Sequence, residues 1–283
     1  MKSVSDIEET RRQVLAMRRD GHTVGLVLTM GALHIGHRSL IDAARKRCHR
    51  VVVSIFVNPT QFAPGEDCDR YPRTIEADLA VCRESGVDLV FVPSVEQMYA
   101  ADAATTVHVD RLTEGLCGAH RLGHFDGVTT VVTKLFNIVP AHMAFFGEKD
   151  YQQLKTVQRM VLDLNLPIQI VPCPTVREPD GLAVSSRNSY LTPSQRRQAL
   201  SLYRALRNAV DAFAAGQRDA RQLTEQAAGE IRGAGPVEID YVSVVDAETL
   251  EPLEIVDAPA RICVAARIGR CRLIDNLPLA SSK

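Results

Sequence analysis

Short apolar runs alternate with helical patterns along the first part of the chain. Apolar runs occupy 24–30, 51–57, 87–92, 141–146 and 168–171, and the run at 51–57 is rich in β-branched residues. Apolar residues at helical spacing occupy 36–48, 74–84 and 151–164. Strands that are apolar throughout and separated by helices are typical of a parallel sheet covered on both faces. With right-handed crossovers, the pattern predicts an α/β fold: a doubly wound parallel sheet of the Rossmann-like type.

The pattern changes after residue 175. The preceding segment, 172–181, is dense in proline and contains Gly181, which marks a loop and a candidate domain boundary. Thr192 and Pro193 then resemble a helix N-cap followed by proline at the first helical position. Helical patterns continue to about 213 and recur at 220–231, and strands are expected at 237–245, 261–266 and 271–274. We therefore predict one domain of residues 1–175 and a smaller α+β domain of residues 176–283.

Composition narrows the class of protein. The 283 residues include 33 Lys and Arg against 34 Asp and Glu, and a net charge of −1 argues against a nucleic-acid partner. The first residues are polar, with no apolar signal segment, and no apolar run approaches the roughly 20 residues of a membrane span. The chain has seven cysteines, an odd number, and no two of them stand at Cys-x-x-Cys spacing. Both observations disfavour a disulfide framework and a zinc site. We expect a cytoplasmic protein without a membrane partner.

One basic group needs an interpretation of its own. Arg261, Arg267, Arg270 and Arg272 gather in the last predicted strands. Such a group could form a basic surface for RNA, but charged residues on the solvated faces of strands are more usual. We interpret these four arginines as solvated, which disfavours a fragment of an aminoacyl-tRNA synthetase.

Two histidines and two glycines directly follow the first predicted strand. His34 and His37 are three residues apart near a helix start, so they occupy neighbouring positions on one face. Free amide N–H groups and the helix dipole favour an anion there. Two imidazoles could donate hydrogen bonds to phosphate oxygens as charge develops on them. The alternative is a surface pair at a helix cap; a metal site is less expected, because no third ligand stands at the usual spacing.

Three further polar clusters follow predicted strands or occupy the boundary loop. They are Asn58 and Gln61; Gly147, Lys149 and Asp150; and Ser185, Ser186 and Arg187. Each cluster alone could be a solvated turn or helix start. Together they stand out, because ligands bind beyond the carboxyl ends of parallel strands. The amides suit hydroxyl and carboxylate groups, the cations and hydroxyls suit phosphate, and Asp150 could hold a ribose hydroxyl or a metal ion.

Absent motifs exclude several classes of nucleotide protein. Residues 118–123 have the glycine spacing of a Walker loop, but His124 stands where lysine is required. No Gly-x-Gly-x-x-Gly follows the first strand, which disfavours a nicotinamide or flavin dehydrogenase, and no Gly-x-Ser-x-Gly supports a serine nucleophile. A triphosphate would have to be held by the histidine pair, Lys149 and Arg187.

The ordered set of motifs resembles the pantothenate synthetase (pantoate–β-alanine ligase) family of the HxGH nucleotidyltransferase superfamily, which has a HUP-type Rossmann-like fold. Residues 34–37 match the signature shared with class I aminoacyl-tRNA synthetases, and residues 185–187 resemble its mobile second signature. Further matching segments are 56–62, 71–74, 123–125 and 146–153. The resemblance runs from about residue 29 to 191. Leu122 stands where proline is expected, and Ala77 where an acidic residue is common.

The resemblance implies a function. ATP would activate pantoate as an enzyme-bound pantoyl adenylate with release of pyrophosphate, and β-alanine would displace AMP to give pantothenate, on the route to coenzyme A. Mg²⁺ would bridge phosphate oxygens, the smaller domain would act as a lid, and the protein would be a homodimer.

The resemblance also implies site residues. The catalytic residues would be His34, His37, Lys149 and Arg187. These four would bind ATP together with Met30, Gly147, Asp150, Ser185 and Ser186. Pantoate would be bound by Asn58, Gln61 and Gln153. Asp78 is the candidate metal ligand, and Arg121 and Tyr71 are candidates near the pocket.

Two other functions stay open at this point. An adenylyltransferase of the same superfamily would pass AMP to a phosphorylated acceptor and would not need the amides of Asn58, Gln61 and Gln153. A regulatory nucleotide-binding module would lack turnover, and would have no reason to keep two phosphate-binding segments on separate strands.

Overall fold

A computed structural model describes residues 1–63, 66 and 68–279. The chain divides into two compact units, each discontinuous in sequence. Unit 1 comprises Met1–Val109, Arg121–Glu148 and Gln153–Pro174. Unit 2 comprises Asp110–His120, Lys149–Gln152 and Thr175–Lys283.

Unit 1 is built on a six-stranded sheet in the order β1-β4-β3-β2-β5-β6, with every pairing parallel. Its strands are β1 (Lys2–Val4), β2 (Val24–Thr29), β3 (Arg50–Ile55), β4 (Leu89–Phe91), β5 (Met143–Gly147) and β6 (Gln169–Cys173). The predicted doubly wound parallel sheet is confirmed. From β2 the chain runs through β3 to β4 on one side, and returns to β5 on the other. The carboxyl ends of β2 and β5 therefore form a topological switch point, where ligands bind in such sheets.

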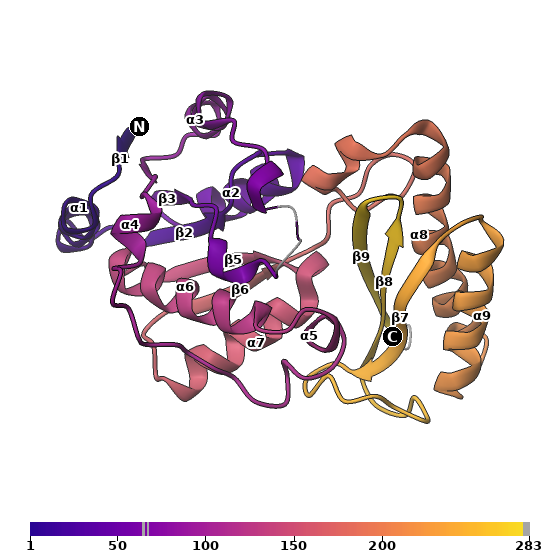
Figure 1. Cartoon of the computed structure of the whole chain (residues 1–283). Coiled ribbons are helices and arrows are strands. Elements are labelled where there is room, and N and C mark those ends of the chain that lie inside the picture. The colour runs from indigo at the N-terminus through magenta and orange to yellow at the C-terminus, as the bar shows by residue number, and fades with distance from the viewer. Residues whose placement is uncertain (64–65, 67, 280–283) are drawn as a thin grey trace. The chain divides into compact units, whose positions relative to one another are not determined.

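Helices cover both faces of this sheet. They are α1 (Ile7–Arg19), α2 (Ile35–Arg47), α3 (Ile75–Glu84), α4 (Val95–Met98), α6 (His124–Ile138) and α7 (Tyr151–Asp163), with 3-10 turns η1 (Pro59–Gln61), η2 (Cys68–Arg70) and η3 (Glu148–Asp150). In the ribbon, α2 and α3 lie above the sheet and α6 below it (Figure 1). The core on the α2 side joins Ile41 of the helix to Val27, Val53 and Phe145 of the sheet.

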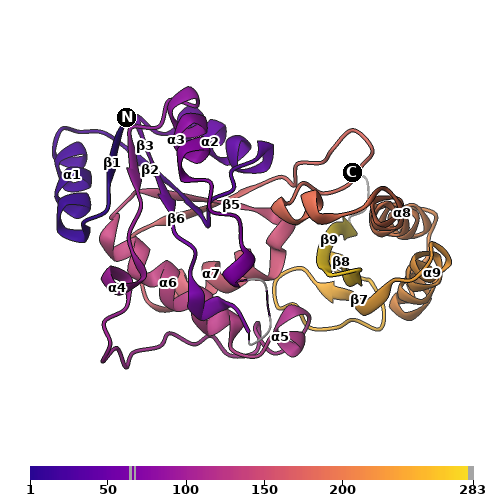
Figure 2. The ribbon, with the colours of Figure 1, turned by 45° about the horizontal axis from the view of Figure 1, so that its top comes forward.

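The sequence pattern did not predict β1, α1 and α6. Helix α1 is rich in charged residues and buries only Thr10 and Val14, so few apolar residues mark it in the sequence. Helix α6 is rich in valine and threonine, which favour strands, yet it is a helix buried along most of its length. Tertiary packing overrides local propensity there. Figure 2 shows α1 at the edge of the unit, beside β1.

Unit 2 contains an antiparallel sheet of three strands in the order β7-β8-β9. The strands are β7 (Glu238–Asp246), β8 (Ala260–Ile268) and β9 (Cys271–Leu279); the helices are α5 (Cys117–His120), α8 (Pro193–Ala214) and α9 (Ala220–Gly233), and η4 is Ser186–Tyr190. The predicted cap of α8 is confirmed, because Thr192 forms a capping box with Gln195 before Pro193. The smaller α+β architecture is confirmed as well.

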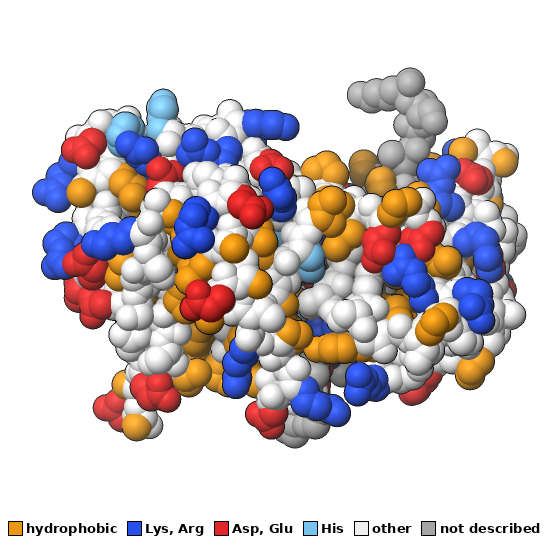
Figure 3. Space-filling view, turned by 90° about the horizontal axis from the view of Figure 1, so that it is seen from above, with side chains coloured by type: hydrophobic (Ala, Val, Ile, Leu, Met, Phe, Trp, Pro, Cys, Tyr) orange, Lys and Arg blue, Asp and Glu red, His pale blue; other side chains and the backbone are white. Residues whose placement is uncertain are grey.

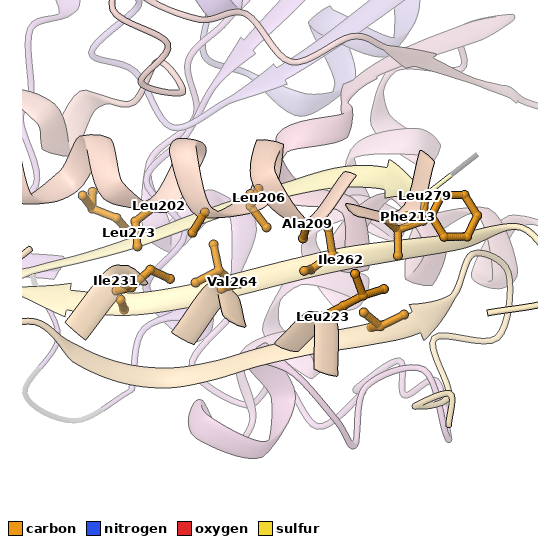
Figure 4. Packing of buried hydrophobic residues seen from close by; sticks show 14 of the residues in the cluster. Leu202, Leu206, Ala209, Phe213, Leu223, Ile231, Ile262, Val264, Leu273 and Leu279 are labelled. Atoms are coloured by element: carbon orange, nitrogen blue, oxygen red, sulfur yellow. The ribbon is translucent and has the colours of Figure 1, made fainter. Parts of the chain in front are cut away.

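The core of unit 2 lies on one face of this sheet. Leu206 and Phe213 of α8 and Leu223 of α9 pack on Ile262 of β8 and Leu279 of β9 (Figure 4). Side chains of a strand alternate between its two faces, so the residues between these apolar positions point to the opposite face of the sheet.

The interpretation of the four arginines as solvated is wrong for two of them. Arg261 is only 8% exposed. The guanidinium of Arg272 is largely buried and donates to Asp240 (Nε to Oδ2, 2.6 Å). Arg267 and Arg270 are exposed as expected. A buried guanidinium needs partners, and those of Arg261 bear on the candidate site.

Two further observations concern the helices and the surface charges. None of the helices in the described part of the chain has the length and apolar character needed to cross a membrane. On the face drawn in Figure 3, lysine and arginine side chains are interspersed with aspartate and glutamate.

Candidate active site

The histidine pair caps helix α2. The Gly36 N–H donates to His34 Nδ1 (3.2 Å), and the His34 N–H donates to His37 Nδ1 (3.3 Å). The two rings stack with their centroids 4.0 Å apart. Because each Nδ1 accepts an amide hydrogen, the proton of each neutral ring is on Nε2. Both rings therefore carry their N–H donor on the same ring atom, at the positive end of a helix.

A buried carboxylate holds the loop before these histidines. Asp78 of α3 is 2% exposed, and it accepts the N–H groups of Ala32 (3.0 Å) and Leu33 (2.7 Å). The Thr74 hydroxyl donates to both of its oxygens, at 3.3 Å. Gly31 (φ 85°) and Ala32 (φ 50°) have left-handed backbone, which is costly for alanine, so the loop needs such support.

No metal cage accompanies Asp78. Across residues 1–63, 66 and 68–279, no group of three or more His, Cys, Asp or Glu side chains is arranged to hold a metal ion. Both oxygens of Asp78 accept hydrogen bonds from protein groups. Its role as a metal ligand stays a prediction.

Asn58 uses its whole amide on protein partners. Its Nδ2 donates to the Gln61 Oε1 (3.2 Å) and to the Gly127 carbonyl (3.1 Å). Its Oδ1 accepts from Thr60 Oγ1 (2.9 Å) and Tyr99 Oη (2.7 Å). These four bonds match the capacity of an amide, and Asn58 is 2% exposed. In this arrangement Asn58 organises the segment around it.

The orientation of Gln61 follows from that arrangement. Since its Oε1 faces a donor of Asn58, its Nε2 points the other way, and it donates to Met30 Sδ (2.9 Å). A thioether is a weak acceptor, so a hydroxyl or carboxylate oxygen would be a better partner for this N–H group. The structure thus brings Asn58, Gln61 and Met30 together.

Helix α6 supports the same segment. A Cβ on Gly127 would lie 2.3 Å from the Thr60 carbonyl oxygen, so only glycine allows η1 to lie this close to the helix. Nearby, His124 Nδ1 lies 2.7 Å from the Gln61 carbonyl oxygen and Nε2 lies 2.9 Å from Arg121 Nη1. A carbonyl only accepts and a guanidinium only donates, which assigns the His124 proton to Nδ1.

Arg121 is fixed in turn by Glu66. The guanidinium donates to both carboxylate oxygens, at 2.7 and 2.6 Å, and to the Gln61 carbonyl at 3.3 Å. Burial alone would raise the pKa of Glu66, but the hydrogen bonds and charge of Arg121 outweigh it and hold the pKa below its ordinary value. Arg121 thus contacts the main chain of Gln61, and its place near a substrate pocket stays a prediction.

The remaining predicted residues of unit 1 stand at sheet ends and helix starts. Gly147 ends β5, next to β2 in the sheet, and a Cβ there would meet open space. Gln153 is half-buried in the first turn of α7. Tyr71 is buried, with its ring 6.1 Å from that of Phe62.

Unit 2 carries the other predicted residues. Lys149 Nζ lies 3.9 Å from Asp150 Oδ2, and the Asp150 side chain is half exposed. Ser185 caps η4, where its hydroxyl accepts the Arg187 N–H at 3.3 Å. Ser186 and Arg187 begin that turn. The assignment of all these residues to one ATP site stays a prediction.

Comparison with known proteins shows the family to which this chain belongs. A family model described as pantoate-beta-alanine ligase matches residues 2–278. A pantothenate synthetase of Moorella thermoacetica is 53% identical over 99% of this chain and 99% of its own length. The chain belongs to the pantoate–β-alanine ligase family.

Solved structures of the pantoate–β-alanine ligase family have the same fold. The crystal structure of pantothenate synthetase from Thermus thermophilus is 48% identical, with a TM-score of 0.93 over 98% of this chain and 99% of that one. That of pantoate-beta-alanine ligase from Francisella tularensis, complexed with beta-gamma ATP and beta-alanine, is 33% identical, with a TM-score of 0.82 over 100% and 99% of the two chains. The family resemblance found in the sequence is confirmed, and an adenylyltransferase is not favoured.

Sequence reasoning missed several residues that organise these candidates. Tyr99, Glu66 and Gly127 act through contacts with residues 41 to 69 positions away, which no local pattern reveals. Gly127 alone offered a signal, because a glycine inside a helix often marks a close approach of two backbones.

Proposed function

We propose that this protein condenses pantoate with β-alanine at the expense of ATP, by way of a pantoyl adenylate. A carboxylate oxygen of pantoate attacks the α-phosphorus of ATP, and pyrophosphate leaves. The amine of β-alanine then attacks the acyl carbon, the bond from that carbon to AMP breaks, and the nitrogen loses a proton as the amide forms. The products are pantothenate, AMP and pyrophosphate.

The observation that carries the proposal is the capped histidine pair. Adenylation of a carboxylate needs charge stabilisation and alignment rather than a protein nucleophile. His34 and His37 direct their Nδ1 atoms to backbone amides, so their Nε2–H groups serve the phosphates of ATP. Their rings are fixed by the cap before substrate binds, and such preorganised donors lower the cost of charge developing on phosphate oxygens.

The other candidates divide between the two substrates of the first step. Lys149 and Arg187 pair with phosphate oxygens, aided by the hydroxyls of Ser185 and Ser186. Met30, Gly147 and Asp150 contact the nucleoside. Gln61 donates from Nε2 to pantoate, and Gln153 and Asn58 complete that subsite, Asn58 by fixing Gln61.

Mg²⁺ belongs to the proposal as a partner of ATP. It commonly keeps several waters and binds through substrate phosphates with only one or two protein carboxylates, so the lack of a multidentate cage among the described residues fits it. When bound, it neutralises charge on the phosphate oxygens. A homodimer and a cytoplasmic location also stay predictions.

Exchange of label between pyrophosphate and ATP tests the proposal. The protein should catalyse exchange only when pantoate is present, and should form AMP only when β-alanine is added. His34→Ala and Lys149→Ala should each lower exchange by about a hundredfold or more, as expected when a preorganised donor to a developing charge is lost. Matched controls are His22→Ala and Lys46→Ala, which remove the same side chains elsewhere in the chain. Exchange that ignores pantoate, or survives both substitutions, would contradict the proposal.

A further inference from the structure

The polar face of the β7-β8-β9 sheet holds buried groups that the proposed function does not use. Asn276 of β9 is 4% exposed and Arg261 of β8 is 8% exposed. They lie on the face opposite the apolar core, as the alternation from Leu279 and Ile262 requires. Buried amides and guanidinium groups are costly unless they are paired, so their partners show what this face is built to hold.

Asn276 holds the main chain of Lys149. Its Nδ2 donates to the Lys149 carbonyl at 3.0 Å, and its Oδ1 accepts a hydrogen bond from Arg261 Nη1. The orientation of this amide is unambiguous, because a guanidinium only donates and a carbonyl only accepts. Asn276 therefore links a fixed arginine to the backbone of the residue whose ammonium is assigned to phosphate.

The same face fastens the chain two residues later. The Arg261 guanidinium stacks on the ring of Tyr151, 3.8 Å from its centroid, and the Tyr151 hydroxyl donates to the Ala247 carbonyl at 2.7 Å. Residues 149 and 151 are thus both held by the β7-β8-β9 sheet and the loop that follows β7. These contacts fix the backbone from which the Lys149 side chain extends.

The neighbouring residue of β9 holds the loop that leads to the second phosphate-binding segment. Asp275 accepts two hydrogen bonds from Arg177, at 2.6 and 2.9 Å, and Arg177 also donates to the Gly181 carbonyl at 3.1 Å. This loop leads directly into η4. At the start of β9, the Cys271 thiol lies 3.7 Å from the Arg187 carbonyl oxygen. Residues of one strand thus contact both cationic segments.

We propose that β9 is a positioning strand for the adenylation step, and that Asn276 is the residue through which it places Lys149. The inference rests on the proposed function, because it concerns the ATP contact assigned to Lys149. A purely structural role for Asn276 would lower stability without depending on the Lys149 side chain. A positioning role makes the effect of Asn276 on ATP binding depend on that side chain.

A double-mutant cycle measured by ATP titration calorimetry separates these roles. Asn276→Asp keeps an acceptor for Arg261 but loses the N–H donor to the Lys149 carbonyl. We expect the Kd for ATP to rise about tenfold in this variant, and to change by less than about twofold when the same substitution is made in Lys149→Ala. Asn137→Asp is the matched control, because the Asn137 Nδ2 also donates to a backbone carbonyl (Thr133, 2.8 Å), and it should leave ATP affinity unchanged.

Equal losses of ATP affinity in the two backgrounds would overturn the inference, as would an unchanged Kd in Asn276→Asp. If Asn276→Asp does not fold, Asn276→Ala removes the same donor without adding a charge, and it enters the same cycle. Pantoate-dependent exchange by the unsubstituted protein is measured separately. If the protein binds ATP but catalyses no exchange, the proposed function is contradicted, and the double-mutant cycle still decides the role of Asn276. If the protein does not bind ATP, both the proposed function and the inference on Asn276 are overturned.

Discussion

Replacement of Asp78 by asparagine should loosen the loop that precedes the histidine pair. The two side chains have nearly the same shape, so the substitution changes charge and hydrogen bonding rather than packing. One of the two amides that Asp78 accepts, from Ala32 or Leu33, would then face an NH₂ group instead of a carboxylate oxygen. The other bond would persist, but to a neutral acceptor.

The hydrogen bonds of Asp78 set the free energy of unfolding that Asp78→Asn should lose. Loss of one buried hydrogen bond to a charged group lowers the free energy of unfolding by about 1.5–3 kcal/mol. A buried N–H group left without an acceptor has a similar cost. For a unit of this size, each kcal/mol corresponds to about 2–4 °C in Tm. A loss near 2 kcal/mol therefore predicts a Tm lower by about 4–8 °C. Because Asp78 supports the loop leading to His34, kcat for pyrophosphate exchange should fall as well.

Thermal unfolding followed by circular dichroism gives the first readout, and a Mg²⁺ titration of the exchange reaction gives the second. Loop support predicts a lower Tm with an unchanged Mg²⁺ midpoint. An unchanged Tm combined with a raised Mg²⁺ requirement would refute the reasoning, and would instead identify Asp78 as a metal ligand.

Two further predictions concern the Asn58 and Gln61 region. Tyr99→Phe removes a donor to the buried Asn58 amide, worth about 0.5–1.5 kcal/mol, so the KM for pantoate should rise about twofold to tenfold while the KM for ATP stays the same; an equal rise in both constants would count against it. Glu66→Gln weakens the pair with Arg121 and should lower stability at pH 7 by about 1–2 kcal/mol. The folded-state pKa of Glu66 is depressed, so its contribution to the free energy of unfolding is present above the unfolded-state pKa and is lost as the pH falls through the folded-state value. The Tm values of the unsubstituted protein and of Glu66→Gln should therefore converge in acid. A constant difference in Tm down to about pH 3 would contradict this prediction.

Much of the fold follows from hydrophobic periodicity. The buried strands β2 and β3 are apolar along nearly their whole length, because helices cover both faces of the sheet. The same reasoning fails for α6, whose valines and threonines favour strands in isolation and whose helix is set by burial against the rest of unit 1. It also fails for the edge strand β1, where three residues give too short a pattern to recognise.

The candidate site was predictable where chemistry and position coincide in sequence. His34 and His37 stand three residues apart at a helix start, so their shared cap follows from local geometry. The support of Asn58 by Tyr99 does not, because a side chain 41 positions away completes that amide. Likewise, the sequence does not show that Arg261 is buried, because its contact with Tyr151 joins residues far apart in the chain.

The bond from Asn276 to the Lys149 carbonyl also has a consequence for the timing of synthesis. It joins residues 127 positions apart, so at about 5–20 residues per second Asn276 is added roughly 6–25 s after Lys149. During that interval a growing chain already contains the histidine cap and the Lys149 ammonium, but not the strand that fixes the backbone of Lys149. On the proposed role of Lys149, full ATP affinity should therefore appear only once β9 has been made and has paired with β8.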